Sequence, residues 1–225
     1  MRASALALVA VLVSLVLIAD TGTTAQQTVV VRGRATIDVP VPTRRATSAY
    51  PSRSIARTEL AARSELRNVV VFLRDAPARA MTPTRVEIRQ HAEQFLPRVV
   101  AVPVGSQVAF PNDDPFFHNV FSLARARTFN LGRFPKGQSR NVRFDKPGTV
   151  KVFCDIHSHM SATVMVFDHP WFATPDEDGR FKIADVPLGD HQITAWHERL
   201  GDTTIRMRIE AGHTASLEFV LPVSR

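Results

Sequence analysis

A single cysteine lies beside two potential copper ligands in one short segment of the chain. Cys154, His157 and Met160 follow the spacing Cys-x-x-His-x-x-Met, and a further histidine, His118, lies 36 residues before the cysteine. One thiolate, two imidazoles and a thioether are the ligands of a trigonal copper centre with a weak axial methionine. The four residues therefore predict one type 1 copper ion, whose chemistry is one-electron transfer.

Each of these residues has a simpler explanation when it is taken alone. A lone cysteine is usually a small buried apolar side chain, a methionine beside a strand usually fills a core, and eight histidines place some near others by chance. Their coincidence around one loop favours a metal site. Zinc is the rival metal, but a thioether is a poor zinc ligand, so the residue types favour copper.

His159 is a competing candidate ligand because it stands next to Met160. Neighbouring residues of an extended segment point to opposite faces, so His159 would reach the metal only if the loop wound differently. We therefore prefer His157 as the ligand and expect His159 to be an exposed loop side chain.

Residues 66–168 resemble the cupredoxin family of plastocyanin- and amicyanin-like blue copper proteins. The Cys-x-x-His-x-x-Met loop and the segment VPVGSQVAFPNDDPFFHN at 102–119 carry the resemblance. It implies a Greek-key β-sandwich and a bond from Asn119 across to the Cys154 loop, with His157 at the solvent edge. It also implies that His118, Cys154 and His157 are the equatorial copper ligands and that Met160 is the axial ligand.

The first 25 residues read as a secretory signal peptide. Arg2 precedes a mostly apolar run at 5–19, and small residues precede Gln26. The run is about 15 residues, whereas a membrane span needs about 20. We expect the segment to be cleaved and the protein to be periplasmic or otherwise exported, without stable membrane insertion. A solitary thiol outside the cytosol is prone to oxidation, and copper ligation explains its presence there.

Composition predicts an all-β chain. Val, Thr, Phe and Ile recur in short runs that Gly and Pro interrupt, a pattern typical of antiparallel sandwiches. We predict a signal peptide at 1–25, an N-terminal extension at 26–65, the copper domain at 66–168 and a small β-sandwich at 169–225.

The last of these segments resembles a carboxypeptidase regulatory-like domain, which has a small transthyretin-like sandwich. Its markers are the D-x-D-G-x-F turn at 176–181 and the V-P-x-G turn at 186–189. The first turn is also similar to a calcium loop, but the glutamate that completes an EF-hand is missing, so a plain turn is preferred. A copper domain with such a tail resembles exported proteins loosely labelled methylamine-utilisation or plastocyanin-like.

Positive charge is concentrated in the predicted copper domain. The chain carries a formal charge of +7, and residues 121–151 hold eight bases against Asp145 alone. A solvated surface is the simplest explanation, but such a field also steers an oppositely charged partner. An acidic redox protein, such as a cytochrome or a dehydrogenase, is one hypothesis. Nucleic acid is disfavoured because no aromatic stacking strip accompanies the bases.

An enzyme is the weaker interpretation of this sequence. It contains no G-x-S-x-G motif, P-loop or paired-carboxylate signal, and catalysis at copper usually needs an open coordination position, which four protein ligands do not leave. Two alternatives to an electron carrier stay open: a copper-binding carrier that does not turn over electrons, and a non-redox adhesion or glycan-binding module.

Overall fold

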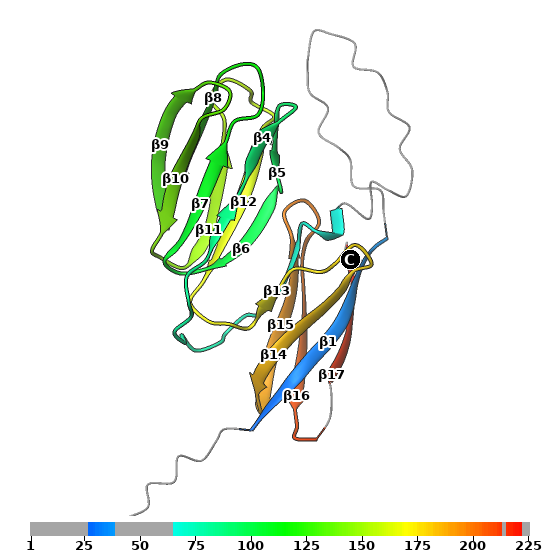
Figure 1. Cartoon of the computed structure of the whole chain (residues 1–225). Helices are drawn as coiled ribbons and strands as arrows, with labels where there is room; N and C mark the ends of the chain where they lie inside the picture. Colours follow the sequence, from blue (N-terminus) through cyan, green and yellow to red (C-terminus); the bar gives the residue numbers. More distant parts are fainter. Residues whose placement is uncertain (1–26, 39–64, 213–214, 222–225) are drawn as a thin grey trace, which may run out of the picture.

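The computed structural model describes residues 27–38, 65–212 and 215–221, whose strands form two β-sandwiches (Figure 1). The prediction of an all-β chain built from sandwiches is confirmed. The predicted signal segment at 1–25 lies outside the described residues. Within the described part, no helix is long and apolar enough to cross a membrane.

The first sandwich contains the predicted copper ligands. Strands β6, β12, β11, β8 and β9 form one sheet in that order, β10, β7 and β3 form the facing sheet, and β4 and β5 form a hairpin. The bounds of these strands are β3 Arg85–Glu87, β4 Arg89–His91, β5 Gln94–Leu96, β6 Val99–Pro103, β7 Ser106–Pro111, β8 His118–Ala124, β9 Arg127–Phe134, β10 Ser139–Phe144, β11 Gly148–Phe153 and β12 Ser161–Phe167.

Side chains along the strands of the first sandwich alternate between its core and its surface. In β11, Val150 and Val152 are fully buried while Lys151 between them is only half-buried, as expected for a strand with one face on a core. Large aromatic side chains fill the space between the sheets, and Phe95 packs edge-on against Phe110 with ring centroids 6.4 Å apart. The sandwich thus encloses one continuous apolar core, to which Cys154 and Met160 belong.

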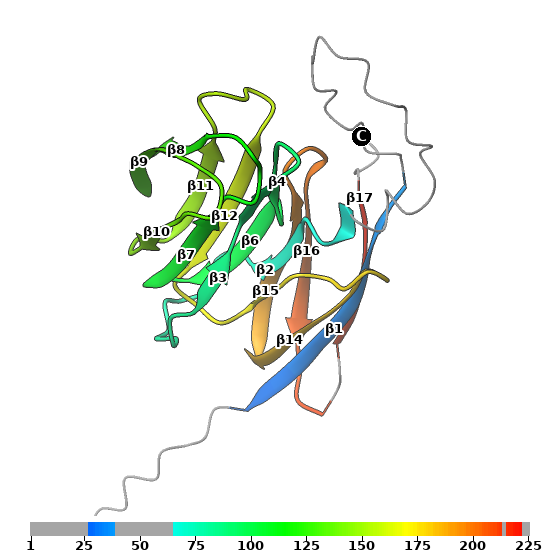
Figure 2. The same cartoon turned by 45° about the horizontal axis from the view of Figure 1, so that its top comes forward.

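The second sandwich consists of strands from both ends of the chain (Figure 2). One sheet has the order β14-β1-β17 and the other has the order β13-β2-β15-β16. The bounds are β1 Thr28–Ile37, β2 Val69–Leu73, β13 Phe172–Ala173, β14 Arg180–Pro187, β15 Gly189–His197, β16 Gly201–Ile209 and β17 Ala215–Leu221.

Strand pairing places two segments differently from the linear division predicted from the sequence. β1, which we assigned to the N-terminal extension, pairs with β14 and lies parallel to β17. β2, which we assigned to the start of the copper domain, pairs with β13 and β15. A short apolar strand fits any sheet that offers an edge and an apolar face, so its neighbours in sequence do not reveal its neighbours in space. The regulatory-like assignment of residues 169–225 stays a prediction.

An apolar interface joins the two sandwiches. Phe167, at the end of β12, stacks on Phe172 of β13 with ring centroids 4.5 Å apart and packs against Phe72 of β2 at 5.2 Å. Further apolar side chains of both sandwiches belong to the same cluster: Val70, Met81, Val99, Ala101, Met165 and Trp196. The strand that follows the predicted copper loop therefore ends in this interface.

An ionic cluster at the same interface surrounds Glu198, which follows β15. The Glu198 side chain is only 4% exposed and forms an ion pair with Arg98, which precedes β6. Lys151 of β11 places its Nζ 3.3 Å from Glu198 Oε2, and Thr163 of β12 donates to the same oxygen at 3.5 Å. One carboxylate of the second sandwich is thus bound to three segments of the first.

Candidate metal centre

The four predicted ligands lie at one end of the first sandwich, three of them at the ends of strands. His118 opens β8, Cys154 directly follows β11, and Met160 directly precedes β12. Strands β11 and β12 pair continuously from Gly148 opposite Val166 to Phe153 opposite Ser161, so the loop between them is held at both ends. His157 lies within that loop, where its backbone carbonyl accepts a hydrogen bond from Met160 N at 3.0 Å.

A register shift in β8 helps to aim the first histidine inward. His118, Asn119 and Val120 are all buried, although strand residues normally alternate between faces. The pairing of β8 with β9 shifts between Asn119 and Phe121, and such bulges commonly redirect side chains beside functional sites. The sequence before His118 does not predict this register shift.

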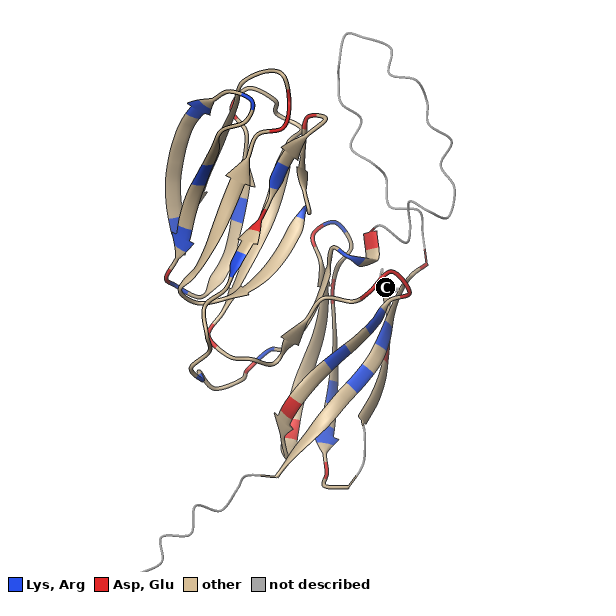
Figure 3. Ribbon diagram, in the orientation of Figure 1, with Lys and Arg blue, Asp and Glu red and all other residues tan. Residues whose placement is uncertain are grey.

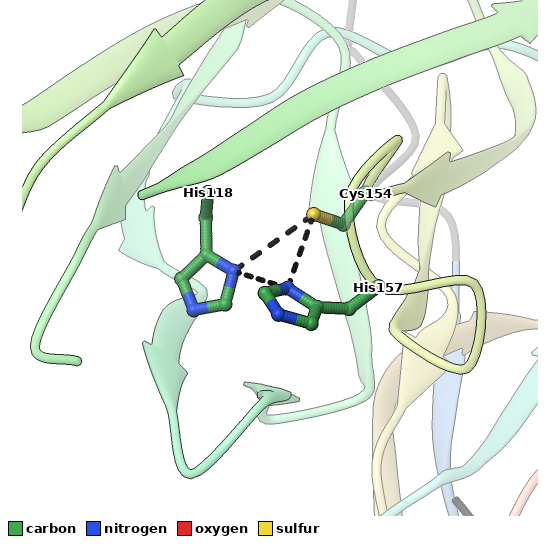
Figure 4. Close-up of side chains that lie close together, drawn as sticks. All are labelled: His118, Cys154 and His157. Atoms are coloured by element: carbon green, nitrogen blue, oxygen red, sulfur yellow. Dashed lines mark hydrogen bonds between the residues drawn. The ribbon is translucent and has the colours of Figure 1, made fainter. Parts of the chain in front are cut away.

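The structure brings three of the predicted side chains together around one point (Figure 4). His118 Nδ1 lies 3.8 Å from Cys154 Sγ, His157 Nδ1 lies 3.9 Å from the same sulfur, and the two Nδ1 atoms are 3.1 Å apart. In the described part of the chain, these three residues are the one group of His, Cys, Asp and Glu side chains close enough to hold a metal ion.

These distances fit a trigonal metal site. With metal–nitrogen bonds of roughly 2.0 Å and a metal–sulfur bond of roughly 2.3 Å, trigonal ligands place nitrogen atoms roughly 3.5 Å apart and nitrogen and sulfur roughly 3.7 Å apart. The observed nitrogen–sulfur separations, 3.8 and 3.9 Å, are slightly longer than this value, and the nitrogen–nitrogen separation, 3.1 Å, is slightly shorter. The combination of one thiolate with two imidazoles is the donor set of a blue copper site. The residues present therefore fit copper.

The surroundings of Cys154 favour the thiolate form that a metal needs. Burial raises the pKa of the Cys154 thiol, but the neighbouring His118 imidazole and the backbone N–H groups of Asn119, His157 and Ile156 outweigh burial and lower the pKa to about 6. The ordinary value is well above neutrality. At neutral pH the sulfur is thus ready to bind a cation without first losing a proton to solvent.

His118 is supported by a carboxylate that the sequence reasoning missed. Its Nε2 lies 2.8 Å from Asp114 Oδ2, and both side chains are buried. Burial lowers the pKa of His118, but Cys154 and Asp114 reverse the effect and raise the pKa above its ordinary value. The i, i+4 spacing of Asp114 and His118 was visible in the sequence, but a loop gives such spacing no fixed geometry.

Asn119 does not play the part that the family resemblance implied. Its backbone N–H interacts with the Cys154 sulfur, but its side-chain Oδ1 is buried without a hydrogen-bond partner. Among the described residues, no hydrogen bond joins the Asn119 side chain to the Cys154 loop. The backbone of β8, held by its pairing with β11 at Phe121 opposite Phe153, makes the connection instead.

His159 also differs from its expected exposed position. It is half-buried, and its Nε2 lies 3.2 Å from Glu93 Oε2 at the end of the β4–β5 hairpin. Its ring centroid is 6.1 Å from that of His157, and it does not belong to the group of potential metal ligands. The pair with Glu93 gives His159 a structural partner away from Cys154.

Replacing His159 by alanine is expected to leave the copper spectrum and the reduction potential nearly unchanged, because its imidazole pairs with Glu93 rather than facing Cys154. The visible spectrum of the copper-loaded variant checks this. His157→Ala is the matched comparison within the same loop. Loss of the spectrum in His159→Ala, together with its retention in His157→Ala, would reverse the ligand assignment.

Met160 is buried at the end of the loop, in the same apolar core as Cys154. Its backbone carbonyl accepts from Cys154 N at 3.4 Å, which closes the loop. Ligation through its thioether stays a prediction.

We expect Met160→Leu to keep the blue colour and to raise the reduction potential, because a weak axial thioether tunes the potential and its loss favours Cu(I). Voltammetry of the copper-loaded variant measures the shift. Met165→Leu is the control, since Met165 is buried at the interface between the sandwiches. An unchanged potential in Met160→Leu would argue against axial ligation.

Part of this chain is similar to solved copper proteins. A copper-containing nitrite reductase from Thermus scotoductus matches 42% of this chain and 25% of its own, with 25% identity and a TM-score of 0.36. An amicyanin mutant in its Cu(I) form matches 36% of this chain and 81% of its own, with 21% identity and a TM-score of 0.35. A purple cupredoxin from Nitrosopumilus maritimus matches 34% and 84%, with 28% identity and a TM-score of 0.31.

These likenesses are partial. The match to the nitrite reductase spans a quarter of that enzyme's length. No protein-family model matches the chain, and no curated protein is significantly similar to it. The assignment of copper therefore depends on the geometry of this chain's own His118, Cys154 and His157.

Proposed function

We propose that this chain is an exported type 1 copper protein that carries single electrons between redox partners. The convergence of His118 Nδ1, His157 Nδ1 and Cys154 Sγ at one end of a rigid sandwich supports the proposal. Copper held there would supply reversible one-electron chemistry. The signal-like segment at 1–25 supports export and a periplasmic location.

The rigid support of the ligands favours electron transfer over catalysis. His118 and Cys154 are both buried. His118 belongs to β8 and Cys154 directly follows β11, so the positions of these two side chains depend little on the oxidation state of a bound ion. Met160 as a fourth ligand would leave no open position for a substrate, which catalysis at a metal usually requires. The residues thus suit a site that exchanges electrons without exchanging ligands.

His157 offers the contact with a redox partner. It is half-buried on the loop, and the ring of Phe116 packs against it with centroids 5.5 Å apart. Phe116, Phe117 and Ile156 are 38%, 54% and 39% exposed. An exposed apolar rim around one ligand lets a partner approach closely and exclude water.

Basic side chains near this rim support an acidic partner. Figure 3 shows Lys and Arg along the strands of the first sandwich. Arg133 and Lys136 are exposed beside the end of β9, whose Phe134 pairs with His118, and Arg133 lies 3.7 Å from Asp155 in the copper loop. The field of these bases would steer an acidic cytochrome or dehydrogenase towards His157.

The rate of electron exchange with an acidic cytochrome is expected to fall as ionic strength rises, because salt screens this attraction. Lys136→Gln should lower the rate at low salt and weaken its salt dependence. Arg206→Gln changes an exposed base of the second sandwich and serves as the control. Stopped-flow mixing measures the rates, and a rate indifferent to salt would contradict an acidic partner.

Electron transfer itself is tested by a redox titration of the copper-loaded protein. The proposal predicts a reversible transition of one electron per copper ion, with no loss of metal on repeated cycling. Bound copper that does not cycle, together with its transfer to an apo acceptor, would favour the copper-carrier function instead.

A further inference from the structure

We propose that Asp114 is a positioning residue that holds His118 with its Nε2 protonated and its Nδ1 directed towards Cys154, and that the tip of the β4–β5 hairpin fixes Asp114 for this task. The inference rests on the proposed copper function. It identifies residues other than the ligands that hold a ligand in place for that function.

Three donors occupy the two oxygens of the Asp114 carboxylate. His118 Nε2 lies 2.8 Å from Oδ2, Glu93 N donates to Oδ2 at 3.0 Å, and Ala92 N donates to Oδ1 at 2.7 Å. The backbone N–H of Asp114 in turn donates to Asn112 Oδ1 at 2.9 Å. A buried carboxylate with this many partners has one orientation, so it offers His118 one fixed acceptor.

The hairpin tip adopts an uncommon backbone conformation to make these bonds. Ala92 and Glu93 have φ angles of 52° and 54°, and they are the two residues between β4 and β5. Two-residue turns of this kind usually contain Asn and Gly, because other side chains rarely adopt positive φ. Here both N–H groups of the turn point at one carboxylate, which resembles the anion-binding nests formed by successive backbone amides.

The same hairpin tip also contacts the copper loop. Glu93 donates its backbone N–H to Asp114, while its side chain pairs with His159 at 3.2 Å. One residue thus connects the segment before β8 with the loop at 154–160. The first of these segments leads directly into His118, and the second contains His157.

Fixing the tautomer has a direct chemical consequence. A neutral imidazole carries one proton, and the nitrogen without it is the one that binds metal. The Asp114 carboxylate accepts a hydrogen bond from His118 Nε2–H, which leaves Nδ1 with its lone pair towards Cys154 Sγ at 3.8 Å and His157 Nδ1 at 3.1 Å. Carboxylates that orient metal-binding histidines typically change metal affinity by 10–100-fold.

Histidine ¹⁵N NMR of the metal-free protein at about pH 9, above the ordinary imidazole pKa, tests the tautomer without any copper. The wild-type protein is expected to show His118 protonated at Nε2. Asp114→Asn presents an amide in place of the carboxylate, so His118 should shift towards the Nδ1-protonated form. Asp113→Asn is the matched control, because Asp113 pairs with Arg89 and not with His118.

Copper binding supplies the second readout. Asp114→Asn is expected to weaken Cu(II) binding by about 10–100-fold, with Asp113→Asn unchanged. A wild-type His118 that carries its proton on Nδ1 and not on Nε2 would overturn the positioning role, even if no variant folded. Unchanged tautomer and affinity in folded Asp114→Asn would overturn it too. Failure of the wild-type protein to bind copper, with His118 still protonated at Nε2, would instead count against the proposed function alone.

Discussion

Replacing Cys154 by serine is expected to abolish the intense visible absorption of the copper-loaded protein. The band of a blue copper site arises from charge transfer between the thiolate and Cu(II), and this chain has one cysteine. A serine hydroxyl is a hard donor that stays protonated at neutral pH. Absorption spectra of the two proteins at equal copper loading measure the effect.

His159→Ala is the control for this loss, because it alters the same loop but leaves the cluster of His118, Cys154 and His157 intact. Cys154→Ser should also reduce the affinity for Cu(I), since soft sulfur favours that oxidation state. An unchanged band in Cys154→Ser would mean that the colour comes from another site, and the copper assignment would be wrong.

Glu198→Ala is expected to lower the free energy of unfolding by about 3 kcal/mol, because removing one member of a buried ion pair leaves the other charge without its partner. The Glu198 carboxylate is almost fully buried and binds Arg98, Lys151 and Thr163 across the interface between the sandwiches. Equilibrium unfolding in urea, followed by fluorescence, measures the change.

Asp190→Ala is the matched control, since Asp190 pairs with Arg208 on the surface and its side chain is 77% exposed. Exposed pairs contribute about 0–1 kcal/mol, so this variant should lose little stability. Equal losses in the two variants would show that the interface does not depend on Glu198. Two separate unfolding transitions in Glu198→Ala alone would show that it couples the sandwiches.

The candidate ligands were predictable because most of them are local in sequence. Cys154, His157 and Met160 fall within one short loop between two strands, where spacing constrains geometry directly. His118 could be added because its imidazole completes the ligand set of a type 1 copper site. The structure places His118, Cys154 and His157 within ligand distance of one another, and it buries Met160 in the same apolar core as Cys154.

Features that depend on long-range contacts were not predictable in the same way. The pairing of β1 with β14 joins residues about 150 positions apart, and nothing in the apolar pattern of β1 selects that partner. The role of Asp114 depends on a hairpin tip at positive φ. The residue types Ala92 and Glu93 do not predict that conformation. Asn119 was assigned by family resemblance, but the contact with the Cys154 sulfur comes from its backbone N–H and not from its side chain.

The central claim is that His118, Cys154 and His157 hold a redox-active copper ion, and its most direct test is the visible spectrum of the apo protein after one equivalent of Cu(II) is added. We predict an intense blue thiolate-to-copper band that bleaches with a mild reductant and returns on reoxidation. A pale spectrum without thiolate character, or no band at all, would contradict the account.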